Sequence, residues 1–157
     1  MLGLALTLGC ASVKPKAPRH DESPAASIDQ INLLAVPVAL NFDQAPGLDG
    51  FVVKIYAGNR GRAKPVPILS GSVEVLMYDG VVREYPKTVQ PRRTWKYSAE
   101  ELKSRLTKTS IGTGYQVAPQ WGDAKPAGDK ISVVARYTPP QGAAIYSAPS
   151  VIAVPGN

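Results

Sequence analysis

The sequence predicts an all-β fold, namely an antiparallel two-sheet sandwich of about seven strands with one short helix. Chain breakers are frequent, with 14 Gly and 15 Pro in 157 residues, and they leave little room for long helices. The apolar fraction of 44% and the charged fraction of 19% are typical of a globular protein that buries a core. Runs of strand-forming residues alternate with turn residues along most of the chain. These observations favour short strands that are joined by turns and packed as two sheets.

The chain divides into three parts by composition. Residues 1–10 are expected to be a leader, residues 11–27 a Pro-rich disordered tether, and residues 28–157 the β-sandwich domain. The tether has no aromatic residue and mixed charge, so we expect an extended, solvated spacer. His20, the only histidine, lies in this spacer. A linker cannot hold the geometry that metal binding or catalysis requires, so His20 is expected to be solvated.

The only cysteine, Cys10, follows an apolar stretch at residues 2–9. This stretch is far too short to span a bilayer as a helix, but it has the right length for the hydrophobic region of a signal peptide. A buried cysteine in an N-terminal strand is disfavoured, because nothing that resembles a strand follows for about 17 residues. A plain secretory leader remains an alternative. A single cysteine also excludes an internal disulfide.

Two strands are predicted in the first third of the domain. Residues 31–42 are rich in strand formers, and Pro37 within them indicates an edge strand or a bulge. Residues 51–58 alternate in polarity, which predicts a half-buried strand. Its expected faces are Phe51, Val53 and Ile55 on the buried side, and Lys54 and Tyr56 on the other.

The middle of the chain is expected to hold a hairpin. A polar, basic loop covers residues 59–67, and the next strand-forming run is interrupted by Asp79 and Gly80. Because Gly accepts a positive φ without steric cost, this pair predicts a tight turn between two strands within residues 72–85. Farther along, Trp95 and Tyr97 alternate and should share a face.

One helix is predicted, at residues 98–106. Ser98 and Glu101 form a capping box, in which each side chain bonds a free backbone N–H at the helix start. The helix is short and should cap one end of the sheet structure. The expected buried stripe consists of Ala99, Leu102 and Leu106, and Glu101 should pair with Arg105 on the outer face.

The C-terminal third predicts three further strands. Residues 112–114 (GTG) are expected to be a turn that leads into a strand at Tyr115. Residues 131–137 alternate and predict the next strand, which ends at a turn over residues 139–142. The last strand is expected to be interrupted near Pro149.

No catalytic constellation can be assembled from the chain. One His and one Cys exclude the Ser-His-Asp and Cys-His arrangements, and also zinc sites built on these residues. The carboxylate pairs are better explained by helix capping and turn formation than by acid–base chemistry. These pairs are Glu100 with Glu101, and Asp123 with Asp129.

Two segments that resemble ligand-binding motifs lack residues that these motifs require. Residues 112–114 lack the third glycine and the long helix of a dinucleotide loop. The calcium-loop-like start at Asn41 and Asp43 has Pro46 where glycine is required. We therefore expect no enzyme activity, no metal, no cofactor and no small-molecule substrate. An envelope enzyme that uses carboxylates alone is the weakest alternative.

Lys and Arg outnumber Asp and Glu by 18 to 12, which gives a net charge of +6. Two loops are candidate anion-binding sites. One carries Arg60, Arg62 and Lys64, and the other carries Arg92 and Arg93 beside Trp95. The simpler interpretation, which the scattered charge favours, is that both loops are solvated turns. Nucleic acid is not an expected partner, because single-strand binding needs several aromatic residues between the positive charges.

The residues Thr7, Leu8, Gly9 and Cys10 resemble the lipobox of bacterial lipoproteins. The resemblance implies that Cys10 receives diacylglycerol and becomes the mature N-terminus, so that the acyl chains anchor the protein in a membrane. Ala11 is not the Asp that favours retention in the inner membrane in this family. By resemblance, the expected location is the bacterial cell envelope, at the outer membrane facing the periplasm.

The leader, the tether and the β domain together resemble small uncharacterised bacterial envelope lipoproteins with an immunoglobulin-like or transthyretin-like sandwich. The segments that carry this resemblance are RTWKYSAEELKS (residues 93–104), IGTGYQV (residues 111–117), ISVVARYTPPQG (residues 131–142) and YSAPSVIAV (residues 146–154). A more distant similarity, through VVKIY at residues 52–56, is to the envelope lipoprotein of type VI secretion machines.

These resemblances imply a non-catalytic structural or interaction module with an unidentified protein partner in the envelope. The alternative is an adaptor subunit of a secretion or transport complex, which would dock through the Pro-containing strand at residues 31–42.

Overall fold

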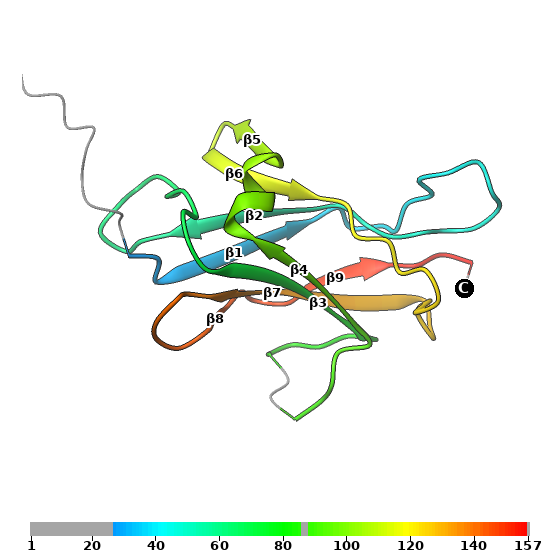
Figure 1. Cartoon of the computed structure of the whole chain (residues 1–157). Helices are drawn as coiled ribbons and strands as arrows, with labels where there is room; N and C mark the ends of the chain where they lie inside the picture. The colour runs from blue at the N-terminus through cyan, green and yellow to red at the C-terminus, as the bar shows by residue number, and fades with distance from the viewer. Residues whose placement is uncertain (1–26, 86–87, 157) are drawn as a thin grey trace, which may run out of the picture.

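The computed structural model describes residues 27–85 and 88–156, and it shows two antiparallel sheets stacked face to face (Figure 1). The predicted leader, the predicted lipidation site at Cys10 and the predicted tether up to residue 26 lie outside the described residues. The elements are β1 (Gln30–Ala35), β2 (Val53–Gly58), β3 (Ser72–Asp79), β4 (Arg93–Ser98), α1 (Ala99–Lys103), β5 (Leu106–Thr109), β6 (Gly112–Val117), β7 (Lys130–Thr138), β8 (Ile145–Tyr146) and β9 (Ser150–Ala153).

The first sheet has the strand order β1-β2-β6-β5. The second has the order β4-β3-β7, and the far edge of β7 pairs with β8 at one end and with β9 at the other. The prediction of an all-β, antiparallel two-sheet sandwich with one short helix is confirmed. The strands are more numerous than predicted, because β5 was not expected and the last predicted strand is two strands.

The core lies between the two sheets and is built from alternate residues of the central strands, as the alternation in the sequence predicts. Val53 and Ile55 of β2 face inward as predicted. Tyr56, which was predicted to lie on the opposite, exposed face, is also buried. Gly114 on the neighbouring β6 has no side chain, so the ring of Tyr56 lies over it; a Cβ there would be 2.6 Å from the ring. The Tyr56 hydroxyl also donates to Thr109 Oγ1 at 3.2 Å.

Pro37 marks the point where the chain passes from one sheet to the other. β1 is an edge strand of the first sheet, as predicted, and it ends before the proline, which has no N–H to continue the pairing. Beyond Pro37 the chain pairs with β9 of the second sheet. Ala39 N–H donates to the Ala153 carbonyl at 2.8 Å, and Ala153 N–H donates to the Pro37 carbonyl at 2.9 Å.

The predicted tight hairpin at Asp79 and Gly80 is wrong. Gly80 does turn the chain with a φ of +75°, but the segment that follows crosses over β7 instead of pairing with β3. Val82 N–H donates to Ser132 Oγ at 2.8 Å, so a side chain of β7 satisfies the backbone that a hairpin partner would have bonded. β3 pairs instead with β4, after a connection at residues 80–92.

Helix α1 begins with the predicted capping box, in which Ser98 N–H donates to Glu101 Oε2 at 2.7 Å and Glu101 N–H donates to Ser98 Oγ at 3.2 Å. Leu102 is fully buried. Leu106 is not, because the helix ends earlier than predicted and Leu106 starts β5 with its side chain exposed. Arg105 lies 5.1 Å from the ring centroid of Tyr97, and the ion pair on the helix joins Lys103 to Glu100.

The C-terminal third follows the prediction except at residues 112–114. These residues begin β6, which forms a hairpin with β5, and the turn is one step earlier, at residues 110–111. β7 and the interruption near Pro149 are confirmed. No helix within residues 27–85 and 88–156 is long and apolar enough to cross a membrane.

Candidate functional site

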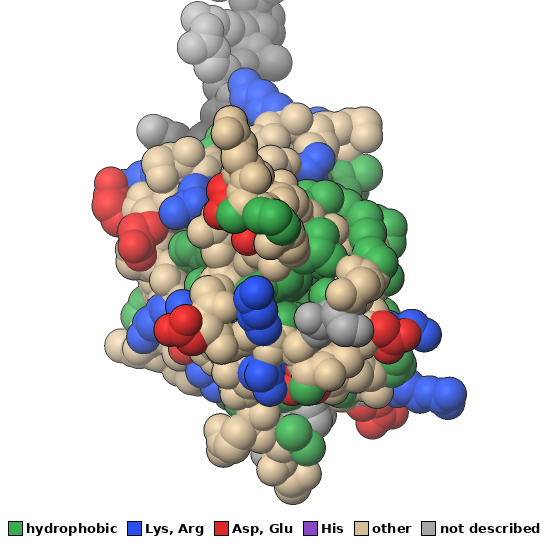
Figure 2. Space-filling model, turned by 90° about the vertical axis from the view of Figure 1, so that its right-hand side faces the viewer, with side chains coloured by type: hydrophobic (Ala, Val, Ile, Leu, Met, Phe, Trp, Pro, Cys, Tyr) green, Lys and Arg blue, Asp and Glu red, His purple; other side chains and the backbone are tan. Residues whose placement is uncertain are grey.

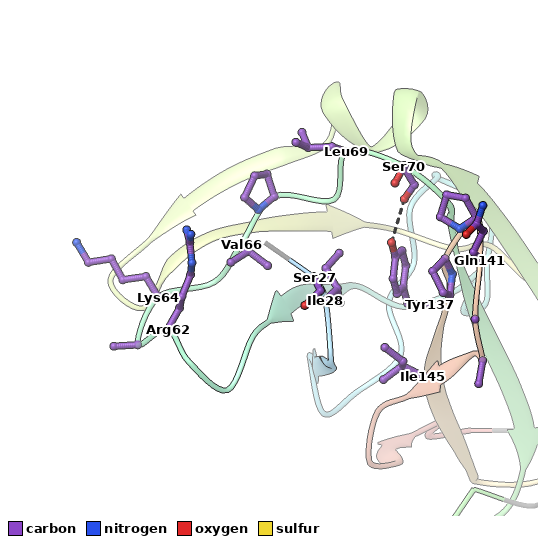
Figure 3. Close-up of a pocket in the computed structure, with 16 residues that line it drawn as sticks. Ser27, Ile28, Arg62, Lys64, Val66, Leu69, Ser70, Tyr137, Gln141 and Ile145 are labelled. Carbon is purple, nitrogen blue, oxygen red and sulfur yellow. Dashed lines mark hydrogen bonds between the residues drawn. The ribbon is translucent and has the colours of Figure 1, made fainter. Parts of the chain in front are cut away.

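An open groove with a volume of about 1030 Å³ lies at one end of the sandwich. One wall is the connection between β2 and β3, and the other is the turn between β7 and β8 (Figure 3). Ser27 and Ile28, at the start of the described chain, complete the lining. We call this end of the molecule the groove end.

The floor of the groove is apolar and continues into the core. Val66 and Tyr137 are buried core residues, while Ile28 and Ile145 pack against the core and remain partly exposed. The Tyr137 hydroxyl donates to the Ser70 carbonyl at 3.2 Å, which fixes the ring between the two walls. Burial raises the pKa of Tyr137 above its ordinary value, so this hydroxyl remains a donor at neutral pH.

The rim of the groove is basic. Arg62 and Lys64 line it, and Arg60 precedes them on the same loop; all three side chains are exposed. Within the part of the chain that the structure describes, no ion pair involves any of them. Figure 3 shows Lys64 extending outward, away from Tyr137 and Ile145. The charged groups are therefore available to an external anion.

Hydrogen bonds hold the backbone of this loop in place, although its side-chain charges form no ion pair with the described residues. Arg62 N–H donates to the Asn59 carbonyl at 2.8 Å, and Gly61 N–H donates to Asn59 Oδ1 at 2.9 Å. Arg60 N–H donates to the Asp29 carboxylate at 3.1 Å. A fixed backbone lowers the entropy that a ligand must remove on binding.

The same loop holds the start of the described chain. Asn59 Nδ2 donates to the Ser27 carbonyl at 2.6 Å, and Asp29 N–H donates to the Gly58 carbonyl at 3.1 Å. The connection back to Cys10 therefore leaves the domain at the rim of the groove.

The second predicted anion-binding pair, Arg92 and Arg93, lies at the opposite end, where β3 ends and β4 begins. Both guanidinium groups already bond to acceptors of the protein. Arg92 pairs with Asp79 at 2.9 Å and donates to the Ala124 carbonyl at 3.3 Å. We call this the far end of the sandwich.

Arg93 has a similar set of contacts at the far end. It donates to the Trp121 carbonyl at 2.5 Å, and its Cζ lies 5.6 Å from the ring centroid of Trp95. Arg93 and Trp121 also line a smaller cavity of about 410 Å³, together with Asp43, Asp49, Gln120, Gly122 and Lys125. The presence of two carboxylates there makes it less suited to anions than the groove.

A third polar cluster, which was not predicted from the sequence, lies on the outer face of the second sheet. Arg136 pairs with Glu74, an interaction that raises the pKa of the guanidinium. The rings of Tyr85 and Tyr146 stack with centroids 3.9 Å apart, and the bond between their hydroxyls raises the pKa of Tyr85 to about 12. Since Tyr85 comes from the connection after β3, only the tertiary structure brings it to Tyr146.

Among the described residues, no group of three or more His, Cys, Asp and Glu side chains could hold a metal ion. In comparisons with protein-family models, curated proteins and solved structures, the chain matched none of them.

Proposed function

We propose that this protein is a lipid-anchored, non-catalytic interaction module of the bacterial envelope, and that the groove end is its working surface. The observation that carries the proposal is an open groove with an apolar floor and a basic rim whose cations form no ion pair with the described residues. This groove lies at the end of the domain to which the predicted lipid anchor is connected. A concave apolar surface with a few charged groups is typical of a binding site.

The anchor part of the proposal rests on Cys10. We expect the protein isolated from bacterial membranes to begin at Cys10 and to carry added diacylglycerol mass, which intact-mass measurement detects. Cys10→Ser should leave the chain unlipidated and release it from the membrane fraction. An unmodified Met1 form in the soluble fraction of wild-type cells would exclude lipid anchorage.

A second candidate function, an adaptor subunit of an envelope complex, is favoured by an apolar seam between β1 and β9. Hydrophobic side chains gather on one flank of the molecule in Figure 2. The exposed members of the seam are Leu34, Val36, Val38 and Val151. They are neighbours because Val38 pairs with Ala153 and because Ser150 Oγ donates to the Leu33 carbonyl at 3.3 Å. Exposed apolar residues that adjoin a sheet edge are typical of strand-mediated docking.

Pull-down from solubilised envelopes tests the adaptor function. Leu34→Glu with Val151→Glu should remove a stoichiometric partner, because two charges would be buried without counterions. Val81→Glu with Val89→Glu is the matched control, because both valines are exposed but lie in the connection between β3 and β4, away from the seam. Equal recovery of the partner with all variants would exclude the seam as the docking surface.

A further inference from the structure

We propose that the groove end is a second membrane contact, where Arg60, Arg62, Lys64 and Lys108 bind the phosphates of anionic lipids and Leu69 and Ile111 enter the headgroup layer. The inference deepens the proposed function by naming the ligand of the groove end, and it rests on the proposed anchorage for bringing the domain to a membrane.

Two separate segments supply the positive charge. The loop after β2 provides three cations, and the hairpin of β5 and β6 provides Lys108. The hairpin lies directly against the loop, because a Cβ at Gly112 would be 2.7 Å from Pro65 Cδ. Lys108 is exposed, and in residues 27–85 and 88–156 it takes part in no ion pair. The carboxylate bonded to this loop is Asp29, so the surface keeps an excess of positive charge.

The same segments expose large apolar side chains beside the cations. Leu69, on the groove wall, is 61% exposed, and Ile111, next to the contact at Gly112, is 54% exposed. A single exposed aliphatic residue is ordinary, but two of them flanking four cations that form no ion pair with the described residues make an amphiphilic surface. Such a surface places its apolar groups among lipid headgroups and its charges at the phosphates.

The connection to Cys10 makes a lipid surface the favoured occupant. Seventeen peptide steps separate residue 10 from residue 27, and a chain of that length spans at most about 60 Å in any conformation. Since Ser27 is bonded to the loop itself, the groove end is the part of the domain closest to the start of this connection. Anchorage turns lipid contact into an intramolecular event, so a weak headgroup affinity suffices. A free anion would gain nothing from this arrangement, and an acidic protein would gain only if it were itself bound to the membrane.

The test uses the full chain with Cys10→Ser, so that no acyl chain contributes to binding. Its partition is measured onto vesicles of phosphatidylcholine with and without phosphatidylglycerol. We expect binding that requires phosphatidylglycerol and weakens as salt screens the charges. Replacing Arg60, Arg62 and Lys64 together by Gln should lower the partition coefficient about a hundredfold, at about fivefold per basic residue near the surface.

The matched control replaces three exposed cations of the far end, Arg83, Lys125 and Lys130, by Gln. It removes the same charge from the same full chain, so contributions of residues 1–26 cancel in the comparison. The control variant should retain most of its binding. An equal loss in both variants would mean that net charge alone drives binding and would overturn the proposal.

Two further measurements test whether the apolar residues insert and whether the loop binds lipid rather than a free anion. Leu69→Ser with Ile111→Ser should lower binding about tenfold, since partial burial of two aliphatic side chains is lost; no change would exclude insertion. Inorganic phosphate should compete no better than sodium chloride of equal ionic strength. Stronger competition by phosphate would assign the loop to a free anion and overturn lipid recognition. Because every arm lacks a lipidated Cys10, these outcomes are independent of the mass measurement that tests anchorage.

Discussion

The two ends of the sandwich each carry an arginine-rich loop, but the two loops have opposite environments. At the far end, Arg92 and Arg93 bond to Asp79 and to two backbone carbonyls. At the groove end, the described residues provide no ion pair for Arg60, Arg62 or Lys64, and the hydrogen bonds that hold the loop are made by its backbone and by Asn59.

The difference separates cations that hold the fold together from cations that are free to bind. A bonded guanidinium neutralises a nearby acceptor and contributes to the free energy of folding. An exposed, unpaired cation contributes almost nothing to stability, but it retains its full attraction for an external anion. The far end should therefore respond to mutation through stability, and the groove end through binding.

Replacing Trp121 tests the far end most strongly. Its ring is buried, 6.5 Å from the ring of Phe51, and its Nε1 donates to the Leu48 carbonyl at 3.0 Å. Trp121→Ala should lower the free energy of unfolding by about 3–5 kcal/mol, because it leaves a cavity and an unpaired acceptor. Chemical denaturation measures the change. Leu69→Ala at the groove end should change stability by less than about 0.5 kcal/mol; similar losses in both variants would remove the contrast.

Arg93→Gln and Arg62→Gln compare the two loops directly. Arg93→Gln should cost about 1–2 kcal/mol of unfolding free energy, since a charged hydrogen bond to the Trp121 carbonyl and a contact with the Trp95 ring are lost. Arg62→Gln should leave stability within about 0.5 kcal/mol of the wild type. For binding to phosphatidylglycerol vesicles we expect the reverse: Arg62→Gln should weaken binding more than Arg93→Gln does. If Arg93→Gln weakened vesicle binding more than Arg62→Gln, the assignment of the two loops would be wrong.

The sequence was sufficient for the parts of the fold that depend on local pattern. The alternation in β2 and β7, the capping box at Ser98, and the chain breakers at Pro37 and Pro149 each act within a few residues. Each therefore led to a correct element, and together they predicted the sandwich.

The errors arose where a distant segment decides the outcome. The turn at Gly80 has the residues of a hairpin, but a serine of β7 bonds the backbone beyond it. Tyr56 alternates like a surface residue, but the absence of a side chain at Gly114 leaves room to bury it. Long-range contacts of this kind have no signature in a local pattern.

The candidate site shows the same limit. Both basic loops could be found from composition, but their partners could not. Arg93 takes its acceptor from Trp121, 28 residues away, and Arg92 takes one from Ala124, 32 residues away. Lys108 was missed because the hairpin of β5 and β6, which carries it to the groove end, was not predicted.

Ser98→Ala tests whether polar side chains at the groove end also contribute to the free energy of unfolding. Ser98 is close to this end, because Ala99 N–H bonds the carbonyl of Gly71, just before β3. The variant should lose about 1 kcal/mol of unfolding free energy at neutral pH, since a helix cap is lost. Thermal or denaturant unfolding of both proteins gives the difference.

The loss of stability in Ser98→Ala should also depend on pH. Bonds from the Ser98 backbone N–H and hydroxyl lower the pKa of Glu101 in the folded state. A carboxylate with a lowered folded-state pKa stabilises the protein above its unfolded-state pKa, and this stabilisation is lost as the pH falls through the folded-state value. The difference between wild type and Ser98→Ala should therefore shrink as the pH falls below about 4.5. A difference that grows on acidification would contradict the bonding of Glu101 to Ser98.

Tyr146→Phe tests a paired group on the outer face of the second sheet, and its expected effect on stability is the smallest. The hydroxyl bond between Tyr146 and Tyr85 raises the pKa of Tyr85 to about 12, so the variant should return it toward the ordinary value near 10. Because the raised pKa favours the protonated folded state, the stabilisation from Tyr85 is present below pH 10 and is lost as the pH rises from about 10 to 12. NMR titration of ¹³C-labelled tyrosine measures the shift. Tyr137→Phe, in the floor of the groove, should leave Tyr85 at about 12. An unchanged Tyr85 in Tyr146→Phe would show that the stacked pair does not share a hydroxyl bond, so that burial alone would have to explain its pKa.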